Sequence, residues 1–119
     1  MNTPSPIRYV DAPISTELIK QLAVELFGDM VKAVVDVERK VMAIGGELHA
    51  DEEAYLLEKG SVQANLWGIN IYPGQPLPQA IEFDSMINVR PSQGNRSRGV
   101  EDEALRAKIT KVVESLITP

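Results

Sequence analysis

Two stretches in which apolar and polar residues alternate narrow the possible folds more than any other feature of this sequence. The first stretch, 30–38, places four apolar residues at alternate positions: Val31, Ala33, Val35 and Val37. The second stretch, 80–90, does the same with Ile81, Phe83, Ser85, Ile87 and Val89. Successive side chains of a β-strand point to opposite faces, so a period of two is typical of a half-buried strand. We therefore expect strands at 30–38 and 80–90.

Each of these strands has a predicted partner next to it in the sequence. A strand at 41–49 follows the first after a tight connection at Arg39 and Lys40, and a two-residue hairpin would place Lys32 opposite Glu47. A strand at 66–72 precedes the second across a proline-rich loop, 73–78. Residues 7–10 add a short edge strand. Hairpin connections predict a mostly antiparallel sheet.

Helical periodicity predicts three helices around these strands. They cover 16–27, 52–59 and about 103–117, with Ser15 or Thr16, Asp51 and Asp102 as N-caps. The order is therefore α-β-β-α-β-β-α. This order favours an α+β fold with a four- or five-stranded antiparallel sheet. We expect the helices to pack mainly on one face, which leaves the other face partly polar and uncovered.

Composition limits the classes of protein that fit. A chain of 119 residues is the size of one domain, 1–119, with a loose N-terminal segment over 1–13 that carries three prolines. The absence of cysteine excludes disulfides and thiolate sites, and it suits a cytoplasmic location. No signal peptide or membrane-spanning run is visible. The net charge of −5 disfavours general binding to nucleic acid.

The polar face of the predicted sheet is one candidate site. If the two hairpins lie side by side, seven polar residues gather there: Asp36, Glu38, Glu47, His49, Asn70, Glu82 and Asp84. Glu47, His49, Glu82 and Asp84 are the residues of this set that suit a divalent metal, and Glu47, His49 and Asp84 suit acid–base catalysis. The alternative is that the sheet simply presents charged residues to water. On that interpretation no metal is expected, and the sequence identifies no cofactor.

His49, the only histidine, has two interpretations of its own. Its imidazole is either a base or metal ligand, or a strand-end side chain that bonds to backbone near the next helix.

The segment 88–98 is a second candidate site. It holds three guanidiniums and three carboxamides, from Arg90, Arg96, Arg98, Asn88, Gln93 and Asn95. Arginine forks fit carboxylate or phosphate groups, and a polar loop on a rigid sheet suits binding. Alternatively, Arg96 and Arg98 pair with nearby acids, at 101–103 or on the second helix, and pin the loop down.

Two stretches also resemble a known family. They are 46–53, continuing through Leu56 and Leu57 to 66–70, and 81–102, where the sequence reads IEFDSMINVRPSQGNRSRGVED. They resemble a family of small uncharacterised bacterial and archaeal proteins that is classified as a domain of unknown function. The resemblance covers roughly Val31 to the C-terminus and implies a prokaryotic, cytoplasmic, single-domain protein. It implies no activity and no functional residues.

The sequence therefore favours a binding module over its alternatives. In this hypothesis a small anionic ligand or partner contacts Arg90, Asn95, Arg96, Arg98, Asn88 and Asn70. The first alternative is a metal-assisted or acid–base enzyme on the polar face. The second is a homo-oligomerisation domain that pairs through its uncovered sheet face.

Overall fold

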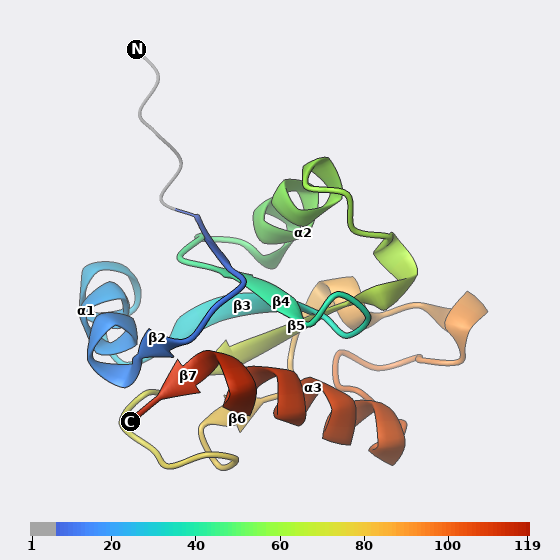
Figure 1. Ribbon diagram of the computed structural model, residues 1–119. Helices are drawn as coiled ribbons and strands as arrows, with labels where there is room; N and C mark the ends of the chain where they lie inside the picture. Colours follow the sequence, from blue (N-terminus) through green and yellow to red (C-terminus); the bar gives the residue numbers. More distant parts are fainter. Residues whose placement is uncertain (1–6) are drawn as a thin grey trace.

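The computed structural model describes residues 7–119 and shows an antiparallel sheet between helices (Figure 1). The strands are β1 (Arg8–Val10), β2 (Ile14–Ser15), β3 (Val31–Asp36), β4 (Val41–Ile44), β5 (Leu66–Ile71), β6 (Ile81–Glu82) and β7 (Ile117–Thr118). The helices are α1 (Thr16–Leu26), α2 (His49–Glu58) and α3 (Glu103–Leu116). Short 3-10 turns form η1 (Gln63–Asn65), η2 (Met86–Asn88) and η3 (Pro91–Gln93).

The main sheet has five strands in the order β1-β4-β3-β5-β6, and each neighbouring pair is antiparallel. The predicted α+β class and antiparallel sheet are confirmed, and so is the edge strand near the N-terminus. The first six residues of the predicted loose segment, 1–6, lie outside the described residues. A second, parallel pair, β2 and β7, ties the end of α3 to the start of α1.

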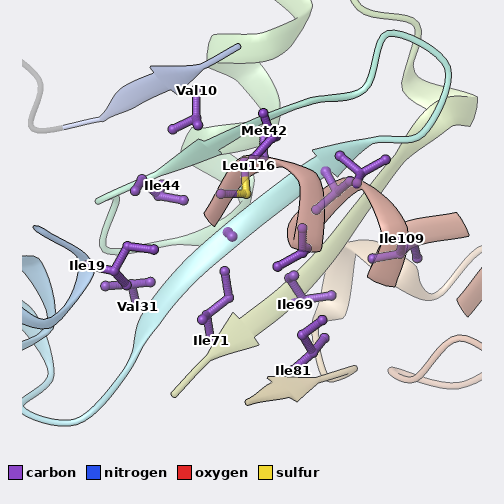
Figure 2. Packing of buried hydrophobic residues seen from close by; sticks show 14 of the residues in the cluster. Val10, Ile19, Val31, Met42, Ile44, Ile69, Ile71, Ile81, Ile109 and Leu116 are labelled. Atoms are coloured by element: carbon purple, nitrogen blue, oxygen red, sulfur yellow. The ribbon is translucent and has the colours of Figure 1, made fainter. Parts of the chain in front are cut away.

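One face of the sheet packs against α1 and α3. Odd-numbered residues of β3 and β5 point to this face, as the alternation predicts, and join the two helices in the larger apolar cluster. Figure 2 shows ten labelled members of that cluster: Val10, Ile19, Val31, Met42, Ile44, Ile69, Ile71, Ile81, Ile109 and Leu116. Among residues 7–119, no helix is long and apolar enough to cross a membrane.

The expectation of an uncovered polar face is wrong. Helix α2 lies on the side of the sheet opposite α3 (Figure 1) and contacts β3 and β4. Its Leu56 packs with Val34, Val41, Ala43 and Leu66 in a second apolar cluster. The even-numbered positions of β3 and β5 are therefore apolar in the middle of the sheet, at Val34 and Leu66. They are polar at both ends of β3, Lys32 and Asp36, and at Asn70 of β5.

The β3–β4 hairpin differs from the predicted two-residue turn. Asp36 pairs with Val41, so four residues connect the strands, and β4 ends before Glu47 can face Lys32. Side-chain chemistry explains the longer turn, because the Asp36 carboxylate accepts the backbone N–H groups of Glu38 and Arg39, both at 2.9 Å. Asp36 is thereby buried at the end of β3 and is not available on an open face.

The predicted strand at 80–90 is also shorter than expected. Within 80–90, only the two residues of β6 pair with β5. Their register, Ile81 with Ile71 and Glu82 with Asn70, matches the predicted faces. After β6 the Ser85 hydroxyl accepts the N–H of Ile87 and starts η2. A side chain that bonds to nearby backbone competes with strand pairing, and here it ends the strand.

Candidate functional site

Helix α2 begins at His49 rather than at 52, which moves the only histidine from a strand end to the first turn of a helix. Its Nε2 lies 2.7 Å from the carbonyl oxygen of Ile69, and the residue is 8 % exposed. A carbonyl oxygen can only accept, so Nε2 carries the proton and Nδ1 keeps its lone pair. The backbone of β5 therefore fixes the tautomer of the ring.

The surroundings of His49 favour its neutral form. Burial lowers the pKa of His49 most strongly, and the positive charges of Lys32 and Arg98 lower it further. The hydrogen bond to Ile69 and the negative charge of Asp84 act in the opposite direction. Two cations and one carboxylate from three separate segments therefore lie close enough to influence the same imidazole.

Asn70 joins β5 to the loop that follows β6. Its Nδ2 donates to Oε1 of Glu82 at 2.8 Å, and it lies 3.5 Å from the carbonyl oxygen of Asp84. Tyr72 donates a second hydrogen bond to the same Glu82 oxygen at 3.2 Å. The Oδ1 of Asn70 is buried, and among residues 7–119 it has no hydrogen-bond partner.

The two cations of this region differ in their engagement. Arg98 donates from Nε to Asp84 at 2.6 Å, and this is its only side-chain hydrogen bond in the described part of the chain. Lys32 pairs in register with Asn70, and its Nζ lies 5.3 Å from the centre of the Phe27 ring. Among residues 7–119, no carboxylate lies within ion-pair distance of this Nζ. We call Lys32, His49, Asn70, Glu82, Asp84 and Arg98 the His49 cluster.

The sequence missed one unusual residue next to this cluster. Glu52, one turn further along α2, is fully buried, and its Oε2 accepts the N–H of Gly46 at 2.9 Å. Its Oε1 has no partner. Burial raises the pKa of Glu52 from 4.5 to about 9, so its carboxyl is protonated at neutral pH. A Cβ at Gly46 would lie 2.8 Å from Glu52 Cγ, so the glycine at this position was the available signal.

Arg90 is built into the fold and does not face a ligand. Its guanidinium donates to the backbone carbonyls of Ile87, Gln63 and Leu66, and its carbon lies 4.5 Å from the centre of the Trp67 ring. It also faces Glu53 of α2 at 3.5 Å. A guanidinium with this many protein partners has little capacity left for a ligand.

The carboxamides of the predicted binding loop also have structural partners. Asn88 is fully buried and exchanges two hydrogen bonds with the backbone of Gly68, at 2.8 and 2.9 Å. Asn95 donates to the carbonyls of Asn88 and Gly99, both at 2.7 Å. These two residues brace the loop from inside.

The remaining predicted residues lie outside the cluster. Arg96 is exposed, and in the part of the chain that the structure describes only its backbone N–H is bonded, to Oε2 of Glu101 at 2.8 Å. Glu47 and Glu38 are exposed, and Asp36 ends β3, where its carboxylate bonds to the hairpin turn. The structure therefore unites four of the seven polar-face candidates, and it adds Arg98 from the loop. Within the described range, 7–119, no three His, Asp or Glu side chains are grouped to hold a metal ion.

Comparison with known proteins adds a family but no activity. The model of one family, described as protein of unknown function (DUF5674), matches residues 8–116. The chain belongs to this family. The match to DUF5674 begins earlier than the resemblance inferred from the sequence and includes β1 and α1. No curated protein and no solved structure matches this DUF5674 chain.

Proposed function

We propose that this protein binds a small carboxylate at the His49 cluster. The observation that carries the proposal is that two incompletely neutralised cations adjoin Asn70: Lys32 pairs with it in the sheet, and Arg98 is held on Asp84, which lies beside it. Lys32 has no ion-pair partner in the described range, and Arg98 engages only Nε. The outer edge of the Arg98 guanidinium keeps donors that suit a carboxylate.

The first turn of α2 supports the same ligand charge. Leu48, the N-cap residue, makes no side-chain hydrogen bond to the turn. No side chain of residues 7–119 caps the amides of His49 and Ala50, and the positive end of the helix dipole adds to the two cations. An anionic group at this position would meet Lys32, Arg98 and backbone N–H donors together.

The neighbouring acids favour a carboxylate over phosphate. Glu82 is held by Asn70 and Tyr72, and Asp84 is held by Arg98. Two carboxylates at the edge of the site repel a phosphate dianion more strongly than a monoanion. They also accept hydrogen bonds from a hydroxyl or amino group on the ligand, as Nδ1 of His49 does.

The single histidine supplies the test. Acetate, lactate and inorganic phosphate are titrated against the full chain while the ring nitrogens of His49 are followed by NMR. A bound anion favours the imidazolium, so the pKa of His49 should rise with acetate and lactate. Lys32→Gln and Arg98→Gln should each weaken that binding about tenfold, which corresponds to one charge-assisted hydrogen bond.

Arg96→Gln is the matched control. It removes the same charge from the same loop, but the Arg96 side chain is exposed and makes no hydrogen bond in the described part of the chain. The proposal fails if neither carboxylate changes the His49 signals, or if Arg96→Gln and Arg98→Gln weaken binding equally.

The free Nδ1 of neutral His49 favours a second candidate function, an acid–base enzyme acting on the bound carboxylate. A base held in one tautomer next to a ligand is the arrangement that proton abstraction needs. Exchange of the methyl protons of pyruvate with deuterated water tests this role. Catalysed exchange that disappears in His49→Gln supports it, and an exchange rate equal to that of buffer rejects it.

Self-association and a cytoplasmic location are two further predictions, and each has its own test. Sedimentation over a range of concentrations distinguishes a ligand-binding monomer from a homo-oligomer, whose mass falls on dilution. Subcellular fractionation tests the location.

A further inference from the structure

We infer that the groove between α3 and the turn joining β3 to β4 is a separate site for an organic anion with an apolar body. The groove has a volume of about 420 Å³ and is lined by Val37 and Val112 together with Lys40, Lys108 and Lys111. The turn and α3, which border it, can be followed in Figure 1. A hollow of about 270 Å³ continues it along α3 to Trp67 and shares Val37, Glu38 and Lys108 with it.

Charge is the first argument for a ligand. The chain as a whole is acidic, with a net charge of −5, yet three ammonium groups line this groove against one carboxylate, Glu38. None of the three lysines forms an ion pair within residues 7–119. Like charges gathered at one concave surface repel one another, and a bound anion relieves that repulsion.

The backbone of Lys40 is a second, independent argument. Its φ is 59°, which lies in the left-handed region, and Lys40 is the only non-glycine residue of the described chain with a positive φ. A glycine would adopt this conformation without the steric cost that a Cβ carries. Strain of this kind persists where a side chain is needed at that position, and here the side chain lines the groove.

The lining also defines the class of ligand. Val37 and Val112 provide an apolar floor, and the methylene stems of the lysines extend it. Ammonium groups act as point charges and suit a phosphate dianion. The ligand expected here is therefore a phosphate ester of an alkyl or aryl alcohol. This groove and the His49 cluster have no residue in common, so the inference does not depend on the carboxylate site.

Butyl phosphate is the probe, and two simpler compounds distinguish the contribution of its charge from that of its apolar body. Inorganic phosphate carries the charge without the apolar body, and butanol carries the body without the charge. Binding to the full chain is measured by calorimetry. The fluorescence of Trp67, the only tryptophan, reports on the connected hollow, and the NMR signals of His49 report on the other site.

Butyl phosphate should bind at least about tenfold more tightly than inorganic phosphate, and butanol should not bind. Lys108→Gln should weaken butyl phosphate about tenfold. Lys20→Gln, an exposed lysine of α1 outside the groove, should leave the affinity unchanged. Lys40→Gly should weaken binding without lowering the unfolding midpoint, because it removes an ammonium and relieves the backbone together.

Three results would overturn the inference. In the first, butyl phosphate and inorganic phosphate bind equally, so the apolar floor has no role. In the second, the Lys108 and Lys40 variants bind as the unaltered chain does. In the third, butyl phosphate shifts only the His49 signals, which would assign its binding to the carboxylate site.

Discussion

The buried carboxyl of Glu52 gives the sharpest test of this structure, through the change Glu52→Gln. Glutamine has the shape of the protonated acid and can still accept the N–H of Gly46. It differs in having no proton to lose. The comparison between the two side chains therefore isolates the cost of keeping Glu52 neutral inside the fold.

The size of that cost follows from the difference between the two states. In the unfolded chain Glu52 titrates near 4.5, whereas burial raises its pKa to about 9 in the folded protein. A group whose pKa is higher in the folded state contributes its full stabilisation at a pH below its pKa in the unfolded chain. This contribution is lost as the pH rises towards its pKa in the folded protein. Each pH unit between the two costs about 1.4 kcal/mol, so at neutral pH the loss is about 3 kcal/mol.

Urea unfolding from about pH 5 to about pH 8 measures this effect. Glu52→Gln should match the original chain near the acidic end and exceed its unfolding free energy by about 3 kcal/mol at neutral pH. Glu58→Gln is the control, because Glu58 is an exposed acid on the same helix. Its effect should stay within about 0.5 kcal/mol at every pH.

Two outcomes would refute this argument. If the original chain and Glu52→Gln keep a constant difference across the pH range, Glu52 is not held neutral by the fold. If Glu52→Gln is less stable at neutral pH, the ionised carboxylate has a stabilising partner that the hydrogen bond from Gly46 does not supply.

Two further substitutions test how the loop and the sheet are held together. Arg90→Lys should lower the unfolding free energy by about 2–4 kcal/mol, because an ammonium cannot replace the guanidinium fork on three carbonyls and the Trp67 face. Urea unfolding measures this loss, and an equal loss in Arg96→Lys would contradict the explanation. Gly68→Ala should cost about 1–3 kcal/mol, because its Cβ would lie 2.6 Å from Ser85 Cβ. Gly74→Ala, with no atom within 4 Å of the added Cβ, should lower the thermal midpoint far less.

The parts of the fold that follow local rules could be predicted from the sequence. Helix α3 begins after Asp102, whose Oδ1 accepts the N–H of Ala104 at 2.8 Å, as an N-cap acid should. Strand β5 spans nearly the predicted range, and its odd-numbered residues, Trp67, Ile69 and Ile71, face the α1 and α3 side. In these elements capping and periodicity agree with the packing, so nothing overrides the local signal.

The segment after β6 could not be predicted, because its alternation has a different cause. Asn88 exchanges two side-chain hydrogen bonds with the backbone of Gly68 and so replaces a strand residue in the ladder. The absence of a side chain at Gly68 leaves room for Ser85 beside it. The polar residues Asn88 and Arg90 therefore turn inward and bond to backbone. Hydrophobic periodicity alone does not distinguish this arrangement from a strand edge that faces solvent.

The candidate site could be predicted only in part, since charge and residue type do not reveal burial. Arg90 and Arg98 look alike in the sequence, yet Arg90 is 9 % exposed whereas the Arg98 side chain is 55 % exposed. Glu52 resembles any acid in the first turn of a helix, but the fold places it under the backbone of Gly46. These distinctions depend on contacts between residues far apart in the chain.

The sequence presents binding and pinning as alternatives for the loop; the buried residues pin it, and the proposed site assigns binding to Arg98 alone. Asn88 and the N–H of Ser85 both bond to the carbonyl oxygen of Arg98, at 3.0 and 2.9 Å, so its backbone is held in place. Asp84 then orients the guanidinium. A cation that is positioned before the ligand arrives loses little conformational freedom on binding. The buried amides and Arg90 therefore support the proposed site indirectly, by fixing the loop from which Arg98 reaches the His49 cluster.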